Sequence, residues 1–196
     1  MVIAAEHGLG PPTPELAHRA DLGLAQSEPF VIEMLPRLPR VGVALDVAAG
    51  SGRHSILLAG VGLRVVAVDN SIATLGALVG TAREQKLQIS ALAADLSSFP
   101  LPTAAFDLIV NVNFLDRELV PGLKQALKVG GFLLFDTFLA DQAKLGKPRN
   151  PAYLLKHWEL RELLSGLDLL EYREGLAGRY DARRAWRASA LAVRRS

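Results

Sequence analysis

Within residues 44–60, ALDVAAGSGRHSILLAG, an apolar run is followed by a glycine turn and then by a helix-like pattern. This order predicts a buried strand, a tight turn and a helix. Glycines in such a turn let the backbone approach a ligand closely at the carboxyl end of a strand in an open α/β sheet. The stretch therefore predicts an α/β fold with a site for a nucleotide-like molecule at this turn.

Short, near-continuous apolar runs alternate with helix-like patterns along the chain. We predict strands at 43–47, 64–68, 87–94, 106–112 and 132–137, and helices at 52–59, 72–85, 119–127 and roughly 157–165. Two further strands, at 167–172 and 185–193, are joined by a glycine-containing turn without a helix, so that pair is antiparallel. We therefore expect a doubly wound, mostly parallel seven-stranded sheet, Rossmann-like, with right-handed crossovers and an antiparallel terminal strand.

The length of 196 residues, of which 50% are hydrophobic and 21% charged, suits one globular unit. We assign this unit to residues 41–196 and a helical lead-in or cap to residues 1–40, where PTPELAHRADLGLAQ and EPFVIEMLPRL carry helix-like spacing. Because no signal peptide or membrane-spanning run is recognised, we expect a cytoplasmic protein. The lack of cysteine excludes a thiol nucleophile, and four histidines without metal-ligand spacing predict no metal site.

Arginines concentrate near the C-terminus, in RYDARRAWRASALAVRRS, although the formal net charge of the chain is only +2. A basic strip of this kind can hold nucleic acid. The interpretation that we favour is an arginine-decorated edge strand followed by a solvated end.

The glycine turn differs from a dinucleotide-binding loop in two respects. Gly50-Ser51-Gly52 lacks the third glycine of the G-x-G-x-x-G pattern, and Asp46 lies in the strand just ahead of the turn. A carboxylate there repels a diphosphate and attracts an ammonium or a sulfonium group. S-adenosylmethionine carries both cations and no phosphate, so the pattern favours that cofactor over NAD.

Polar residues at the ends of the next strands agree with this cofactor. We expect Asp69 to accept both ribose hydroxyls and Asp95 to reach the adenine amino group beside the apolar wall of Leu96. Asp69 has a second interpretation as a helix cap, and for His54 capping the first helix is favoured over lining the pocket. The predicted cofactor-binding residues are Asp46, Ala48, Gly50, Gly52, Arg53, Asp69, Asn70, Asp95, Leu96 and Asn111.

Three segments resemble the class I S-adenosylmethionine-dependent methyltransferases, and more narrowly the bacterial tellurite-resistance branch: LDVAAGSGRHS, VNFLDRELVPGLKQALKVGGFLLFDTF and KPRNPAYLLKHWELRELLSGLDLLEYREG. The resemblance extends from about Glu28 to the end of the chain. It implies methyl transfer to a small molecule. Within the first motif, Ala48 stands where many class I enzymes carry glycine. Two features depart from the branch: Asp116 stands where it often has histidine, and the first forty residues are less typical of it.

Methyl transfer needs alignment of the acceptor and exclusion of water more than dedicated catalytic groups. We expect Asn113, Phe114, Asp116, Arg117 and Arg149 to face the acceptor. Asn113, Asp116 and Arg117 are the candidate catalytic residues, and Phe114, Arg117 and Arg149 the candidate substrate contacts. The two arginines suit an anionic acceptor, but a purely surface role is equally open.

Tyr153 and Trp158 are expected in the core rather than in the site. Methylation of nucleic-acid amines is disfavoured, because the segment after the fourth strand reads VNVNFLD and lacks the Pro-Pro-aromatic signature. Two alternatives remain open: a protein that binds S-adenosylmethionine without catalysis, and, less favoured, an NAD(P)-dependent oxidoreductase.

Overall fold

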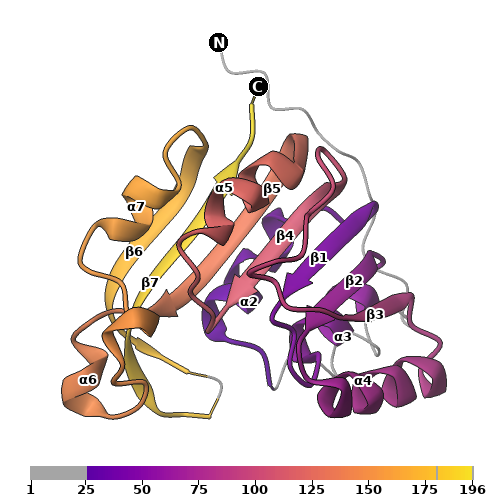
Figure 1. Ribbon diagram of the computed structural model, residues 1–196, viewed down its shortest axis with the longest axis horizontal. Coiled ribbons are helices and arrows are strands. Elements are labelled where there is room, and N and C mark those ends of the chain that lie inside the picture. The colour runs from indigo at the N-terminus through magenta and orange to yellow at the C-terminus, as the bar shows by residue number, and fades with distance from the viewer. Residues whose placement is uncertain (1–25, 180, 196) are drawn as a thin grey trace.

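Seven strands form one sheet in the computed structural model, which describes residues 26–179 and 181–195 (Figure 1). The strands are β1 (Val43–Val47), β2 (Arg64–Asp69), β3 (Ile89–Ala93), β4 (Phe106–Val112), β5 (Leu127–Phe138), β6 (Asp168–Gly178) and β7 (Arg184–Val193). The α-helices are α2 (Pro29–Met34), α3 (Arg53–Gly60), α4 (Ile72–Glu84), α5 (Leu119–Ala126), α6 (Gln142–Leu145) and α7 (Glu159–Leu163). Two short 3₁₀ helices complete the set, η1 (Leu35–Arg37) and η2 (Pro151–Tyr153).

The strand order is β3-β2-β1-β4-β5-β7-β6, running from right to left in Figure 1. Strands β1 to β5 pair in parallel, whereas β7 pairs antiparallel with both β5 and β6. The predicted mostly parallel sheet with an antiparallel terminal strand is therefore confirmed. The order reverses between β1 and β4, and a ligand crevice is expected beyond the carboxyl ends of the strands at this point.

The last strand does not lie at the edge of the sheet. Strand β7 is inserted between β5 and β6, and β6 forms the edge. The interpretation of the C-terminal arginines as decorating a solvated edge strand is wrong for Arg187, whose residue is only 3% exposed. The strand lies inside the sheet, and most of its residues are buried.

Helices cover both faces of the sheet. Consecutive residues of β1 point to opposite faces, as the pleat of a strand requires: Ala44 packs in one apolar cluster and Leu45 in another. The cluster around Ala44 takes side chains from α2 and α3, and the cluster around Leu45 takes them from α5 and α7. The near-continuous apolar runs of the sequence follow from this coverage on two sides.

Most predicted elements are confirmed, and two strands are longer than expected. Strand β5 begins at Leu127, so the KVGG segment lies within it, and β6 continues to Gly178, so its glycines lie within the strand rather than in the turn. Helix α6 and the 3₁₀ helix η2 were not predicted, because elements of three or four residues carry no periodic signal. In the lead-in, α2 lies within EPFVIEMLPRL, whereas residues 12–25 of the other predicted helix lie outside the described residues.

Among the helices of the described residues, none combines the length and apolar character needed to cross a bilayer.

Candidate functional site

A cavity of about 670 Å³ lies beyond the carboxyl ends of the parallel strands. It is lined by residues at or shortly after the ends of β1, β2, β3 and β4, together with part of the segment around η2: Ala48, Asp69, Asn70, Ala94, Asp95, Leu96, Ser97, Phe114, Leu115, Asp116, Arg117, Glu118, Ala152 and Tyr153. The sheet thus brings together residues that the sequence predicted at three separate strand ends, whereas Asn111 and Asn113, predicted at the end of the fourth strand, are not in this lining.

The carboxylate of Asp69 holds the glycine turn in place. Its Oδ2 accepts a hydrogen bond from the backbone N–H of Gly50 at 2.8 Å, and its Oδ1 accepts one from the N–H of Ser71 at 2.9 Å. Ser71, and not Asp69, is the N-cap of α4, since the Ser71 hydroxyl accepts from the N–H of Thr74. The helix-cap interpretation of Asp69 is therefore wrong, and its carboxylate lines the cavity.

Three residues of the turn adopt left-handed backbone conformations, with φ of 52° at Ala48, 54° at Gly50 and 77° at Gly52. Gly52 also lies so close to Leu78 on α4 that a Cβ atom would overlap the leucine side chain. Glycine at this position lets α3 begin against α4. Ala48, the departure from the family pattern, tolerates a conformation that is costly for a residue with a Cβ atom.

Asp46 is buried behind the turn rather than in the wall of the cavity. Its residue is 1% exposed, and its Oδ2 accepts a hydrogen bond from the Ser55 hydroxyl of α3 at 2.6 Å. Burial, opposed by this hydrogen bond, raises the pKa of Asp46 to about 6. The predicted attraction between Asp46 and a cationic ligand stays a prediction.

Asp95 and Leu96 line the same cavity but differ in exposure. Asp95 is exposed, and its Oδ1 accepts hydrogen bonds from the Ser97 hydroxyl at 2.8 Å and from the Ser97 N–H at 3.0 Å. These bonds lower the pKa of Asp95 and keep its carboxylate ionised. Leu96 is buried and contributes apolar surface to the same cavity.

A second cavity, of about 280 Å³, lies at the glycine turn. It is bounded by the turn itself, by Arg53 and His54 of α3, and by Val112, Asn113 and Phe114 at the end of β4. It shares Ala48 and Phe114 with the large cavity, so the two are parts of one cleft. The predicted cofactor contacts Gly50 and Arg53 lie in this part of the cleft.

His54 lines this second cavity and does not cap α3, whose N-cap Gly52 has no side-chain hydrogen bond. The expectation that His54 caps the helix is therefore wrong. His54 is 4% exposed, and no described residue hydrogen-bonds its Nε2. Burial lowers the pKa of His54 to about 3, so its imidazole is neutral and keeps an unpaired nitrogen for a ligand.

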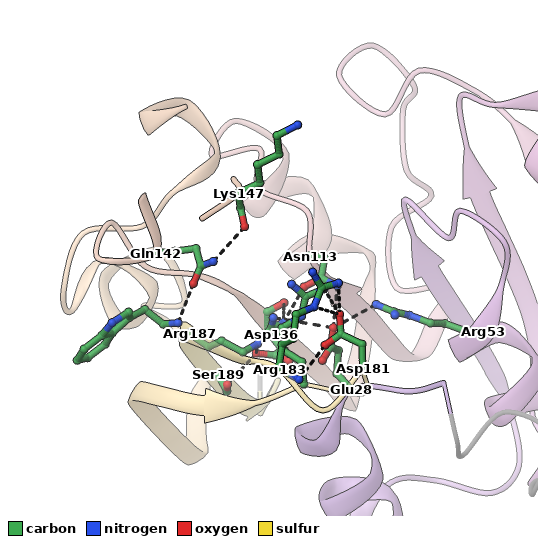
Figure 2. A network of polar contacts seen from close by, with 12 residues as sticks. Glu28, Arg53, Asn113, Asp136, Gln142, Lys147, Asp181, Arg183, Arg187 and Ser189 are labelled. Atoms are coloured by element: carbon green, nitrogen blue, oxygen red, sulfur yellow. Dashed lines mark hydrogen bonds and ion pairs between the residues drawn. The ribbon is translucent and has the colours of Figure 1, made fainter. Parts of the chain in front are cut away.

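A buried polar network joins the cleft to the far strands of the sheet (Figure 2). The amide of Asn113, directly after β4, donates to Glu28 Oε1 at 2.9 Å and accepts from Arg187 Nη2 at 2.8 Å. Arg187 forms two bonds to the Asp136 carboxylate, and Glu28 lies 3.3 Å from Arg53. The orientation of Asn113 at the cleft is therefore fixed from two sides.

Known proteins with a similar sequence or fold are methyltransferases. Residues 44–131 match a methyltransferase domain family. The solved structure of TehB from Haemophilus influenzae superposes with a TM-score of 0.70 at 22% identity, over 84% of this chain and 61% of that one. A solved S-adenosylmethionine-dependent methyltransferase from Methanosarcina mazei gives a TM-score of 0.69 at 18% identity, over 86% and 98% of the two chains.

The chain has the class I methyltransferase fold.

A curated relative, the probable S-adenosyl-L-methionine-dependent methyltransferase TehB of Haemophilus influenzae, is 28% identical over 140 residues. The alignment covers 67% of this chain and 48% of that protein, so the chain matches about half the length of its curated relative. These findings confirm the resemblance in fold and sequence that was predicted from the sequence.

Within this methyltransferase fold, two predicted site residues are bound to the protein itself. Asn111 is buried and donates from Nδ2 to the backbone oxygen of Phe114 at 2.8 Å, which shapes the segment after β4. Arg117 lines the large cavity, but its guanidinium is held by the Glu159 carboxylate and by two backbone oxygens, those of Ala152 and Leu154. Arg117 therefore ties α7 and η2 to the cleft.

The other predicted acceptor residues divide between two places. Asp116 and Phe114 line the large cavity, whereas Arg149 lies in a separate cavity that also includes Asn113. Tyr153 is 57% exposed and lines both cavities, so its expected place in the core is wrong. Trp158 is also exposed, at 60%, and stacks on Tyr172 instead of packing in the core.

Several residues of the site were missed in the sequence. A polar residue inside an apolar strand is the sequence signal that could have revealed two of them: Asp136 interrupts LLFDTF and Arg187 interrupts AWRASALAV. Both are buried and paired, as polar residues inside a sheet must be. Glu28 and Ser55 carry no such signal, because each stands in a helix-like or helix-flanking segment where polar residues are common.

Proposed function

We propose that this chain binds S-adenosylmethionine in the cleft at the glycine turn and transfers its methyl group to a small molecule. The observation that carries the proposal is the pair of carboxylates, Asp69 and Asp95, which lie at the ends of neighbouring strands and line one cavity together with the apolar Leu96. Carboxylates suit the hydroxyl and amino donors of a nucleoside, and Leu96 suits the face of its base.

The charge of the cleft supports a cofactor without phosphates. Of the described residues that line the large cavity, four are acidic and one, Arg117, is basic, and Arg117 is already bound to Glu159. A dinucleotide would place its diphosphate near the buried Asp46, with repulsion instead of the expected helix N-terminal attraction. The cleft therefore favours a cationic nucleoside over NAD.

The residues present divide the cofactor between the two parts of the cleft. The large cavity would hold the nucleoside, through Asp69, Asp95 and Leu96, and the smaller one would hold the amino-acid part, near Gly50 and the unpaired Nε2 of His54. When bound, the cofactor supplies an electrophilic methyl group on a positively charged sulfur.

The chain's own contribution is positional. Phe114 lines both cavities, and Asn113, fixed by Glu28 and Arg187, lies next to it in the lining of the smaller one. These side chains would exclude water and hold the acceptor in line with the methyl group, an effect that accounts for much of the acceleration in such reactions.

Calorimetry with S-adenosylmethionine, S-adenosylhomocysteine and NAD⁺ tests the proposal. We expect the first two to bind and NAD⁺ not to bind. Asp95→Asn should weaken cofactor binding, while Asp168→Asn, on the exposed start of β6, serves as the matched control. Binding of NAD⁺ alone would overturn the proposal.

Mass spectrometry of thiol, oxyanion and amine acceptors then tests catalysis. A methylated product is expected from at least one class. Cofactor binding without any product would instead support the alternative of a protein that only senses S-adenosylmethionine.

A further inference from the structure

A third cavity, of about 650 Å³, adjoins the cofactor cleft, and the described residues that line it are all basic or uncharged. The residues that line it are Asn113, Phe138, Lys147, Pro148, Arg149, Asn150, Tyr153 and Arg179. Three of these eight are cationic and, among the described residues that line the cavity, none is Asp, Glu or His. The cleft for the cofactor is acidic and its neighbour is basic.

The basic cavity meets the cofactor cleft at two residues. It shares Asn113 with the cavity at the glycine turn and Tyr153 with the large cavity. A molecule in the basic cavity therefore has one end beside Asn113, where the methyl group is proposed to lie. This is the geometry of an acceptor site.

Two of the three cations are available to a ligand. Among the described residues, none forms a hydrogen bond or ion pair with the side chain of Lys147 or Arg149. Arg179, by contrast, lies 3.7 Å from Asp181. An anion at Lys147 and Arg149 would face no competing carboxylate from this chain among the residues that line the cavity.

The wall that carries these cations is anchored to the sheet. Gln142 is buried, donates from Nε2 to the backbone oxygen of Lys147 at 3.0 Å, and accepts from the N–H of Trp186 at 3.0 Å. Figure 2 shows the Lys147 side chain extending away from this bond. The Asn150 side chain accepts from the N–H of Ala152 and orders the next turn. The cations are therefore presented from a fixed backbone.

The size and walls of the cavity indicate an organic ligand. A volume of about 650 Å³ lies within the range of roughly 300–1,000 Å³ in which drug-sized molecules bind. Phe138, Pro148 and Tyr153 supply apolar surface, which an inorganic oxyanion would leave unused. An organic body with one anionic group would use both the apolar walls and the cations.

We propose that the acceptor is an organic anion, bound in this cavity with its carboxylate, sulfonate or phosphate at Lys147 and Arg149 and its nucleophile beside Asn113. This inference rests on the proposed function. None of the described residues that line the cavity offers a carboxylate or an imidazole as a base. His54 of the adjoining cavity is a weak base, because burial lowers its pKa to about 3. The acceptor therefore enters already ionised, as a thiolate or an acidic phenolate. The acceptor lone pair forms the new bond to the methyl carbon, the carbon–sulfur bond breaks with its electrons staying on sulfur, and no proton is transferred.

A pair of thiols that differ in one charge tests the proposal. 4-Mercaptobenzoate and 4-mercaptobenzamide present the same nucleophile, and their S-methyl products are measured by mass spectrometry. We expect kcat/KM to be about tenfold higher for the carboxylate, as one charge-assisted hydrogen bond provides. Equal values for the two thiols would overturn the inference while leaving methyl transfer intact.

Variants then locate the anion. Arg149→Gln and Lys147→Gln should each raise KM for the carboxylate about tenfold, without changing kcat or the values for the amide. Lys144→Gln on α6 removes the same charge from the same segment outside the cavity. It is expected to leave KM for the carboxylate and the values for the amide unchanged. An equal effect of all three substitutions would mean that the net charge, and not the cavity, is responsible.

A binding measurement tests the same inference without catalytic turnover. In the presence of saturating S-adenosylhomocysteine, 4-hydroxybenzoate should bind by calorimetry and 4-hydroxybenzamide should bind about tenfold more weakly. No binding of the carboxylate, or methylation of selenite or tellurite in place of both thiols, overturns the inference. Failure of S-adenosylhomocysteine itself to bind is measured separately and overturns the proposed function.

Discussion

Arg187 on β7 and Asp136 on β5 form a buried two-point pair, with Nε 2.9 Å from Oδ1 and Nη2 2.8 Å from Oδ2. The Ser189 hydroxyl donates to the same carboxylate at 2.8 Å. The pair stands behind Asn113, so it connects the stability of the sheet to the geometry of the cleft.

Removal of one partner should be strongly destabilising. Asp136→Ala leaves the Arg187 charge buried without its main partner, and we expect a loss of roughly 3–5 kcal/mol in the free energy of unfolding. The double variant Asp136→Ala/Arg187→Met should recover part of the lost free energy of unfolding, because neither charge of this pair then remains buried without its partner. Denaturant unfolding measures both. Arg173→Ala, which breaks an exposed pair with Glu33, is the control and should change the midpoint little.

Cofactor binding should depend on pH through Asp46. Its pKa in the folded protein, about 6, lies above its ordinary value of 3.8, so the folded chain retains the proton between these values. The contribution of Asp46 to folding is thus present below pH 4 and is lost as the pH rises towards 6. A cationic cofactor favours the ionised form, so its affinity should rise as the pH passes from 5 to 7. Calorimetry across that range checks this, and Asp46→Asn should remove the dependence. An unchanged slope in the variant would reassign the titration to another group.

Two glycines of the turn should respond differently to the same substitution. Gly52→Ala puts a Cβ atom into Leu78 at a left-handed position, and we expect a loss of roughly 2–5 kcal/mol from crowding and backbone strain together. At Gly50 the space is open, so Gly50→Ala meets only the backbone cost of roughly 1–2 kcal/mol. Thermal unfolding of the two variants gives the comparison. Similar losses would show that steric overlap with α4 is not what requires Gly52.

His157 should stabilise the fold most at low pH. Its ring nitrogens lie 2.8 Å from Glu174 Oε2 and 2.8 Å from Asp141 Oδ2, and these bonds, first that to Glu174, raise the pKa of His157. The stabilising contribution is therefore complete below the unfolded pKa of about 6.5 and is lost as the pH rises through the higher folded value. The difference in Tm between the wild type and His157→Gln should shrink from pH 6 to pH 9. A constant difference would assign the effect of the substitution to packing.

Much of the fold was predictable because its signals are local. The bounds of β1 and β4 agree with the apolar runs at 43–47 and 106–112, and α4 begins at Ile72 as its pattern predicts. The strand ends then placed Asp69, Asp95 and Leu96 around one cavity, because the carboxyl ends of parallel strands meet at one edge.

The sequence by itself determined the element types, the glycine turn and the strand-end residues, since each depends on spacing along a few neighbouring positions. Only the tertiary structure showed which environment surrounds Arg187, Tyr153, Lys147 and Arg149. The reason is physical: the same charged or aromatic residue can lie in solvent, in a core or in a cavity, and its type alone does not distinguish these environments. The environment depends on the contact partner. For Arg187 that partner is Asp136, which stands 51 positions earlier, on a strand that lies beside β7 only because of the sheet order.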